Sequence, residues 1–212
     1  MNICSSTPIH LVLVADNSTS MNGAPAAAVT EGIQAWIEEL ASMTRGGKPY
    51  FLFSFIVFGS RVEVVCEGAD VNDIDSQSVE LHGDWGTTAM SAALDAARQV
   101  IVQHAASNHC PPFVFMFTDG QPDDPQGAII AAQALKSQQL PGSVCPRLIT
   151  LGFGNAVRAF LEQLATSSEF SKYMSGANDL ANLLPSIGTP TKAGGGGASI
   201  EDFEKNIREV EI

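Results

Sequence analysis

The chain has 212 residues, enough to bury the core of one large domain. Its composition, 45% hydrophobic and only 16% charged, is typical of a compact globular protein and excludes a disordered one. The formal charge of −12 opposes binding to nucleic acid or anionic lipid, because both require clustered Lys and Arg, and it favours divalent cations and basic partners.

Strand-like and helix-like segments alternate along the chain as far as residue 187. We expect strands at 10–15, 50–58, 61–67, 112–118 and 147–151, a weak strand at 173–175, and helices at 25–44, 89–104, 126–140, 157–165 and 180–187. The second and third strands are joined through Gly59-Ser60, which is short enough for a hairpin. This alternation predicts an α/β domain with a mainly parallel sheet.

The carboxyl-terminal part has a different composition. Residues 189–198, TPTKAGGGGA, have the composition of a flexible linker. Residues 199–212 predict a short acidic amphipathic helix, which is marginal by itself and should either dock on its own domain or occupy a partner's groove. The predicted organisation is therefore a domain at 1–188, a linker at 189–198 and a helix at 199–212.

The amino-terminal residues MNICSSTPIHLVLVAD contain no basic segment, and their apolar run is too short for a signal peptide or a membrane span. The four cysteines are scattered and form no C-x-x-C pair. We therefore expect a reduced, cytoplasmic protein. Cys110 and Cys145, which each precede a predicted strand, are expected to be buried thiols rather than a disulfide.

Carboxylates and hydroxyls follow the predicted strands at three places. The residues concerned are Asp16, Ser18 and Ser20 after the first strand, Thr87 and Thr88 before the helix at 89–104, and Asp119 after the strand at 112–118. Alone, each group reads as a helix cap or a turn. In open parallel sheets, however, ligands bind outside the carboxyl ends of the strands, so we expect these loops to face one crevice.

Two carboxylates and three hydroxyls form a set of hard oxygen ligands with no His or Cys to suit zinc or copper. Mg²⁺ fits such a set best, with Mn²⁺ or Ca²⁺ as the other candidates. In DNSTS we expect Asp16, Ser18 and Ser20 to point inward and Asn17 and Thr19 to point away. Because hydroxyl ligands are neutral, the metal would stay receptive to a carboxylate from a partner.

These residues resemble the von Willebrand factor type A (VWA) family, whose metal-ion-dependent adhesion site (MIDAS) combines D-x-S-x-S with a distant Thr and a distant Asp. The resemblance covers about residues 9–187, with the motifs in the family's order. It implies that Asp16, Ser18, Ser20, Thr88 and Asp119 are the metal ligands. Thr87 stands where the family usually has Gly, which leaves Thr87 and Thr88 as alternatives for the middle ligand.

The resemblance implies a doubly wound, mainly parallel six-stranded sheet with one antiparallel edge strand and helices on both faces. It also implies a non-enzymatic, metal-dependent domain that binds a partner protein through one of its acidic residues. Without a secretion signal the chain looks like the stand-alone bacterial intracellular members, some of which are of the tellurium-resistance type. Trp85, Thr87, Asp123 and Asp124 are candidates for the rim of the partner-binding surface.

Two other functions compete with this hypothesis. A haloacid dehalogenase-type phosphohydrolase would need an acid–base Asp where this chain has Ser18, and neither a P-loop nor a nucleophile elbow occurs. His82 and Asp84 are the only acid–base candidates near the predicted site. A chelatase-type accessory subunit would normally carry a fused ATPase-like region, which this chain lacks. We therefore expect no catalytic residues.

Overall fold

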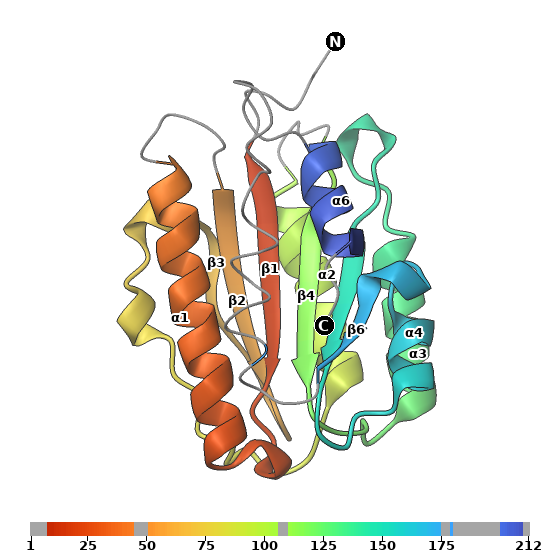
Figure 1. The fold of residues 1–212 in the computed structure, drawn as a ribbon. Coiled ribbons are helices and arrows are strands. Elements are labelled where there is room, and N and C mark those ends of the chain that lie inside the picture. The colour runs from red at the N-terminus through yellow and green to blue at the C-terminus, as the bar shows by residue number, and fades with distance from the viewer. Residues whose placement is uncertain (1–7, 45–50, 106–109, 175–178, 180–199, 210–212) are drawn as a thin grey trace.

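The structure, a computed structural model, describes residues 8–44, 51–105, 110–174, 179 and 200–209 (Figure 1). Its strands are β1 (Ile9–Asp16), β2 (Phe51–Phe58), β3 (Val62–Asp70), β4 (Phe113–Thr118), β5 (Arg147–Gly152) and β6 (Ser171–Tyr173). Its helices are α1 (Ala24–Thr44), α2 (Met90–Gln103), α3 (Pro125–Lys136), α4 (Arg158–Leu164) and α6 (Ile200–Glu209).

The strands form one six-stranded sheet in the order β3-β2-β1-β4-β5-β6. All neighbouring pairs are parallel except β2 and β3, which form the antiparallel hairpin expected from the short Gly59-Ser60 connection. Helices cover both faces of the sheet (Figure 1). The predicted fold class is therefore confirmed. The order of the strands reverses between β1 and β4, which is where open sheets of this kind form their ligand crevice.

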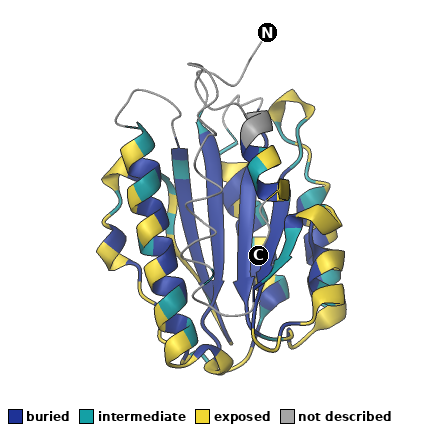
Figure 2. Cartoon of the chain, in the orientation of Figure 1, coloured by how far each residue is buried: buried dark blue, intermediate teal, exposed yellow. Residues whose placement is uncertain are grey.

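The buried core lies on both sides of the sheet (Figure 2). Side chains along β1 alternate between the two faces, as they must in a strand. Leu11 and Leu13 join the apolar cluster that contains Trp36 of α1, whereas Val12 and Val14 join the cluster beneath α2 and α3. Because both faces are covered, β1 and β4 read as continuous apolar runs rather than as alternating ones.

Several boundaries differ from the prediction. The helix expected at 126–140 ends at Lys136, because the hydrogen bonding changes after the C-cap residue Ser137, where Gln138 N donates to the carbonyl of Leu135 at 3.1 Å. The weak strand expected at 173–175 is found at Ser171–Tyr173. The acidic loop contains short 3₁₀ turns at Val71–Asp73 and Ser76–Ser78. The predicted helix at 180–187 and the linker at 189–198 lie outside the described residues.

The carboxyl-terminal helix α6 packs against the sheet. Phe203 and Ile207 are buried in the same cluster as Trp36, and the Phe203 ring lies edge-on to Phe113 with centroids 4.8 Å apart. Arg147 Nε donates to Glu204 Oε1 at 2.8 Å. None of the helices in the described ranges is long and apolar enough to cross a membrane. The division into domain, linker and helix stays a prediction.

Cys110 is disulfide-bonded, whereas Cys145 and Cys66 are free and half-buried. The expectation that Cys110 and Cys145 are two buried thiols is therefore wrong. Because one disulfide uses two of the four cysteines, we expect two thiols to react with a colorimetric thiol reagent in the denatured, unreduced protein. A count of four, as a fully reduced protein would give, would contradict the disulfide. Prior reduction provides the control and should expose all four.

Candidate metal centre

The three polar loops meet at the carboxyl edge of the sheet. β1 and β4 are adjacent and parallel, with Ala15 opposite Phe117, so their ends place Asp16 and Asp119 side by side. Both carboxylates are buried. In Figure 1 this edge is the bottom of the sheet, where the arrowheads of β1 and β4 end. The loop expected to carry Thr88 joins them through the backbone, because Thr19 N donates to the carbonyl of Gly86 at 2.9 Å.

Hydrogen bonds connect four of the predicted ligands. Ser18 N donates to Asp16 Oδ1 at 2.8 Å, which closes the first loop over its own carboxylate. Ser18 Oγ lies 3.1 Å from Ser20 Oγ, and Ser20 Oγ donates to Asp119 Oδ1 at 2.7 Å. The two carboxylates are therefore linked through the backbone N–H of Ser18 and the hydroxyls of Ser18 and Ser20.

Thr118, the last residue of β4, supports Asp16 from behind. Its hydroxyl donates to Asp16 Oδ2 at 2.6 Å and accepts from Gly120 N at 3.2 Å. Burial raises the pKa of Asp16, an effect opposed by hydrogen bonds from Ser18 and Thr118 and increased slightly by the nearby charge of Asp119. Keeping Asp16 ionised therefore costs free energy in the folded protein, and a cation bound in the crevice would offset that cost.

Thr118→Val is expected to weaken metal binding by about tenfold, since outer residues that orient metal ligands typically contribute on this scale. Valine keeps the shape of the threonine but leaves Asp16 Oδ2 without its donor. Isothermal titration of the metal-free protein with Mg²⁺ would measure the change. Thr166→Val is a matched control, because that hydroxyl accepts from Leu148 N on β5 away from the metal loops. Equal losses in both variants would show only general destabilisation.

Thr88 is buried and Thr87 is exposed. Asp123 holds Thr88 in place, because its two carboxylate oxygens each accept from Thr88 N at 3.1 Å while Asp123 N donates to the Thr88 carbonyl at 3.1 Å. The second loop is thus fixed to the loop that carries Asp119. Burial favours Thr88 over Thr87 as the middle ligand, although its ligation, like that of the other four residues, stays a prediction.

The candidate rim residues have varied surroundings. Asp124 caps α3 by accepting from Gly127 N at 2.9 Å, so its carboxylate is already in use, as is that of Asp123. Trp85 is half-buried, and its backbone N–H donates to the carbonyl of Asn17 at 3.0 Å. Trp85 also lies directly against Gly59, where any side chain would collide with it.

Sequence reasoning missed two supporting residues. Asn17 was expected to point away from the site. Its side chain is buried, and its Oδ1 accepts from His82 N at 2.8 Å and Gly83 N at 2.6 Å, which ties the acidic loop to β1. The sequence pattern predicts Thr118 only as the last residue of the strand at 112–118. A signal was present, because a hydroxyl directly before Asp119 ends an otherwise apolar run.

The acid–base candidates do not join the metal loops. The His82 ring is exposed and lies 3.8 Å from a carboxylate oxygen of Glu80, and Asp84 is exposed as well. In the described part of the chain, no group of three or more His, Cys, Asp or Glu side chains is placed to hold a metal ion. The side-chain oxygens that the crevice offers are those of Asp16 and Asp119 and of the serine hydroxyls beside them. Such a hard, all-oxygen set fits Mg²⁺ or Mn²⁺.

The sequence over residues 10–187 matches the family model of the von Willebrand factor type A domain. This match covers well over half of the chain, and the chain therefore belongs to that family. No curated protein matches the sequence.

Solved structures share the fold with little sequence identity. Proximal thread matrix protein 1 of the mussel byssus has a TM-score of 0.66 at 18% identity, covering 85% of this chain and 47% of that one. The pilus adhesin SpaC of Lactobacillus rhamnosus GG scores 0.72 at 14%, covering 94% and 30%. The manganese-loaded TRAP protein of Plasmodium vivax scores 0.59 at 21%, covering 82% and 71%. This chain therefore spans less than half the length of the first two.

Proposed function

We propose that this chain is a non-enzymatic, metal-dependent protein-binding domain. A Mg²⁺ ion would be held by Asp16, Ser18, Ser20, Thr88 and Asp119 and would offer an open coordination position to a partner's carboxylate. The observation that carries the proposal is the chain of hydrogen bonds through Ser18 and Ser20 that links two buried carboxylates at the point where the strand order reverses.

The structural relatives support the metal part of the proposal. The mussel byssus protein has been crystallised with a zinc-occupied MIDAS motif, and the Plasmodium vivax protein with manganese. The chemistry of the ligands supports the rest. Ser18, Ser20 and Thr88 supply neutral oxygens, so only two carboxylates balance a bound dication, which stays electron-poor and receptive to a third carboxylate. Among the described residues, none is positioned as a base or nucleophile in the way that a phosphohydrolase requires.

The finer predictions on cellular context rest on the sequence. A cytoplasmic location and membership of the tellurium-resistance type stay predictions, and a chelatase-type accessory role stays the alternative. Among them, the cytoplasmic location is the one opposed by an observation, because a disulfide at Cys110 is more typical of an oxidising compartment.

The proposal is tested with Mn²⁺ as a paramagnetic stand-in for Mg²⁺. Water exchanging at an open coordination position of bound Mn²⁺ should enhance the relaxation of solvent protons, and a peptide that contains one aspartate should reduce this enhancement by displacing water. The same peptide with asparagine serves as the control and should have no effect. If Mn²⁺ binds but the aspartate peptide leaves the relaxation unchanged, the carboxylate-binding function is refuted. If no metal binds, the whole proposal is refuted.

A further inference from the structure

Two arginines differ from the other basic side chains that the structure describes. Arg98, Arg147, Lys205 and Arg208 pair with carboxylates, and Lys136 and Lys172 donate to backbone carbonyls. Arg61 and Arg158 instead lie over aromatic rings, with the guanidinium carbon 4.2 Å from the centroid of Trp85 and 4.5 Å from that of Tyr173. Both are exposed, and within the described ranges neither has an anionic partner.

Arg61 and Trp85 lie on one side of the candidate metal centre, where backbone hydrogen bonds connect their loops to the first metal loop. Ser60 N donates to the Trp85 carbonyl at 2.6 Å, and Trp85 N donates to the carbonyl of Asn17, the residue after Asp16, at 3.0 Å. The stack of guanidinium on indole limits the motion of an otherwise flexible side chain. The charge of Arg61 is therefore held beside the first metal loop.

Arg158 and Tyr173 lie on the other side, where hydrogen bonds connect them to the loop that carries Asp119. The Tyr173 hydroxyl donates to the Gly154 carbonyl at 2.5 Å, and Asn155 N donates to the carbonyl of Asp119 at 3.0 Å. Arg158 is the first residue of α4, directly after this loop. Its guanidinium is therefore held beside the loop that carries the second carboxylate.

The order of the strands gives the spacing. Arg61 follows β2, the carboxylates of the candidate centre follow β1 and β4, and Gly154 follows β5, so the two arginines lie on opposite sides of the centre in the order β2-β1-β4-β5. Neighbouring strands are about 4.8 Å apart, which places the ends of β2 and β5 roughly 7 Å to either side of a metal between β1 and β4.

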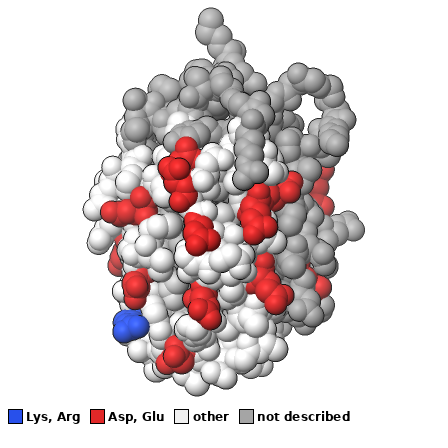
Figure 3. Space-filling model, turned by 90° about the vertical axis from the view of Figure 1, so that its left-hand side faces the viewer, with Lys and Arg blue, Asp and Glu red and all other residues white. Residues whose placement is uncertain are grey.

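This positive charge is conspicuous in an acidic protein. No Lys or Arg occurs between Arg61 and Arg98, a stretch that contains eight Asp and Glu residues. Figure 3 shows the side of the molecule that carries α1 and the acidic loop, where Asp and Glu are widespread and Lys and Arg are nearly absent. The net charge of −12 therefore opposes acidic ligands at long range, and the two stacked arginines supply a local attraction at the metal-bearing edge.

We propose that the partner binds through an extended acidic segment with the pattern acid-x-acid-x-acid, an inference that rests on the proposed function. The central carboxylate would coordinate the metal, and the outer two would accept hydrogen bonds from Arg61 and Arg158. Alternate residues of an extended chain project on the same side about 6.6 Å apart, which matches the spacing of the strand ends. The planar guanidinium fork suits a carboxylate, and stacking presents that fork in one orientation.

The test uses the full chain loaded with Mg²⁺ and two labelled peptides, measured by fluorescence polarisation. One is acetyl-Gly-Asp-Ser-Asp-Ser-Asp-Gly-amide, and the other has asparagine at the two outer positions. We expect the triacid peptide to bind at least tenfold more tightly. Arg61→Gln and Arg158→Gln should each weaken the triacid peptide by about three- to tenfold and leave the monoacid peptide unchanged. Lys205→Gln, an exposed charge on α6, is the matched control and should change neither affinity.

Because the monoacid peptide needs only the metal, its affinity also reports whether an arginine variant is folded. If the monoacid peptide binds with Mg²⁺ but the triacid peptide binds no better, or if the arginine variants retain full affinity, the acidic-segment proposal is overturned and the proposed function survives. If neither peptide responds to removal of Mg²⁺ with EDTA, the proposed function itself fails. If a sulfated oligosaccharide binds through both arginines more tightly than the triacid peptide, the partner is not a polypeptide.

Discussion

Asp16→Asn is expected to abolish the stabilisation of the protein by Mg²⁺ while making the metal-free protein more stable at neutral pH. Burial raises the pKa of Asp16, so the folded state disfavours the charge that the unfolded chain carries freely. For a carboxyl whose pKa is raised by folding, stability is highest below its unfolded pKa and is lost as the pH rises through the folded value. Asparagine cannot ionise, so the variant avoids this loss of stability, and it also lacks the carboxylate that would bind the metal.

Thermal denaturation with EDTA and with saturating Mg²⁺ would measure both effects. The wild type should gain about 2.7 kcal/mol at a metal concentration of 100 times the Kd, and the variant should gain nothing. The stability advantage of the metal-free variant should disappear near pH 3, where Asp16 is protonated in both states. Asp95→Asn, at an exposed carboxylate on α2, serves as the control and should change neither quantity. A variant that is still stabilised by Mg²⁺ would rule out Asp16 as a ligand.

Much of the fold could be predicted because its central strands are strongly patterned. The runs LVLVA and FVFMF are apolar at every position, as strands buried on both faces must be, and the short Gly59-Ser60 connection specified the hairpin. The ends of elements were less predictable, since they depend on single hydrogen bonds. The end of α3 at Lys136, marked by the bond from Gln138 N to the Leu135 carbonyl and followed by the bridge between Leu140 and Val144, is one such case.

The candidate ligands were predictable for a related reason, because each comes directly after a strand or before a helix. Their supporting residues were not. Asn17 and Thr118 look like ordinary polar residues at a strand end, and only the packing of two further loops shows that they hold His82, Gly83 and Asp16 in place. Asp123 was assigned to the rim by its proximity, whereas its contact with Thr88 N depends on how the loops fold onto one another.

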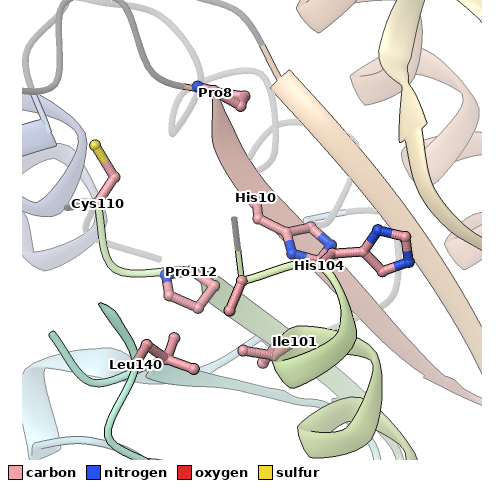
Figure 4. Close-up of a pocket in the computed structure, with 8 residues that line it drawn as sticks. Pro8, His10, Ile101, His104, Cys110, Pro112 and Leu140 are labelled. Atoms are coloured by element: carbon pink, nitrogen blue, oxygen red, sulfur yellow. The ribbon is translucent and has the colours of Figure 1, made fainter. Parts of the chain in front are cut away.

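A second polar cluster lies at the opposite end of the sheet from the metal loops (Figure 4). His10, near the start of β1, is buried in a small pocket beside His104, with ring centroids 6.0 Å apart, and its Nε2 lies 2.8 Å from Ser54 Oγ. Ser54 Oγ also accepts from Gly68 N at 2.9 Å, which ties this pair to β3. Glu67, 4.0 Å from His104, is the carboxylate that faces this pair.

The stability of the metal-free protein is expected to fall between pH 6.5 and pH 4 because of His10. Burial, with a smaller contribution from the charge of His104, lowers the pKa of His10 from 6.5 to about 4. In this window His10 binds a proton in the unfolded chain but not in the folded one. The contribution of the neutral His10 to stability is therefore complete above pH 6.5 and is lost as the pH falls toward 4. At about 1.4 kcal/mol per pKa unit, His10 alone accounts for roughly 3 kcal/mol.

Urea denaturation of the wild type and of His10→Gln in EDTA, at pH 7 and pH 4.5, isolates this contribution from that of the many carboxylates. Glutamine can still hydrogen-bond to Ser54 but fills the site less well and cannot gain a proton, so the variant should be less stable at pH 7 and should lose less stability on acidification. His82→Gln, at an exposed ring, should leave the pH dependence of the wild type unchanged. Parallel curves for wild type and His10→Gln would mean that a buried, neutral His10 is not what makes the fold sensitive to acid.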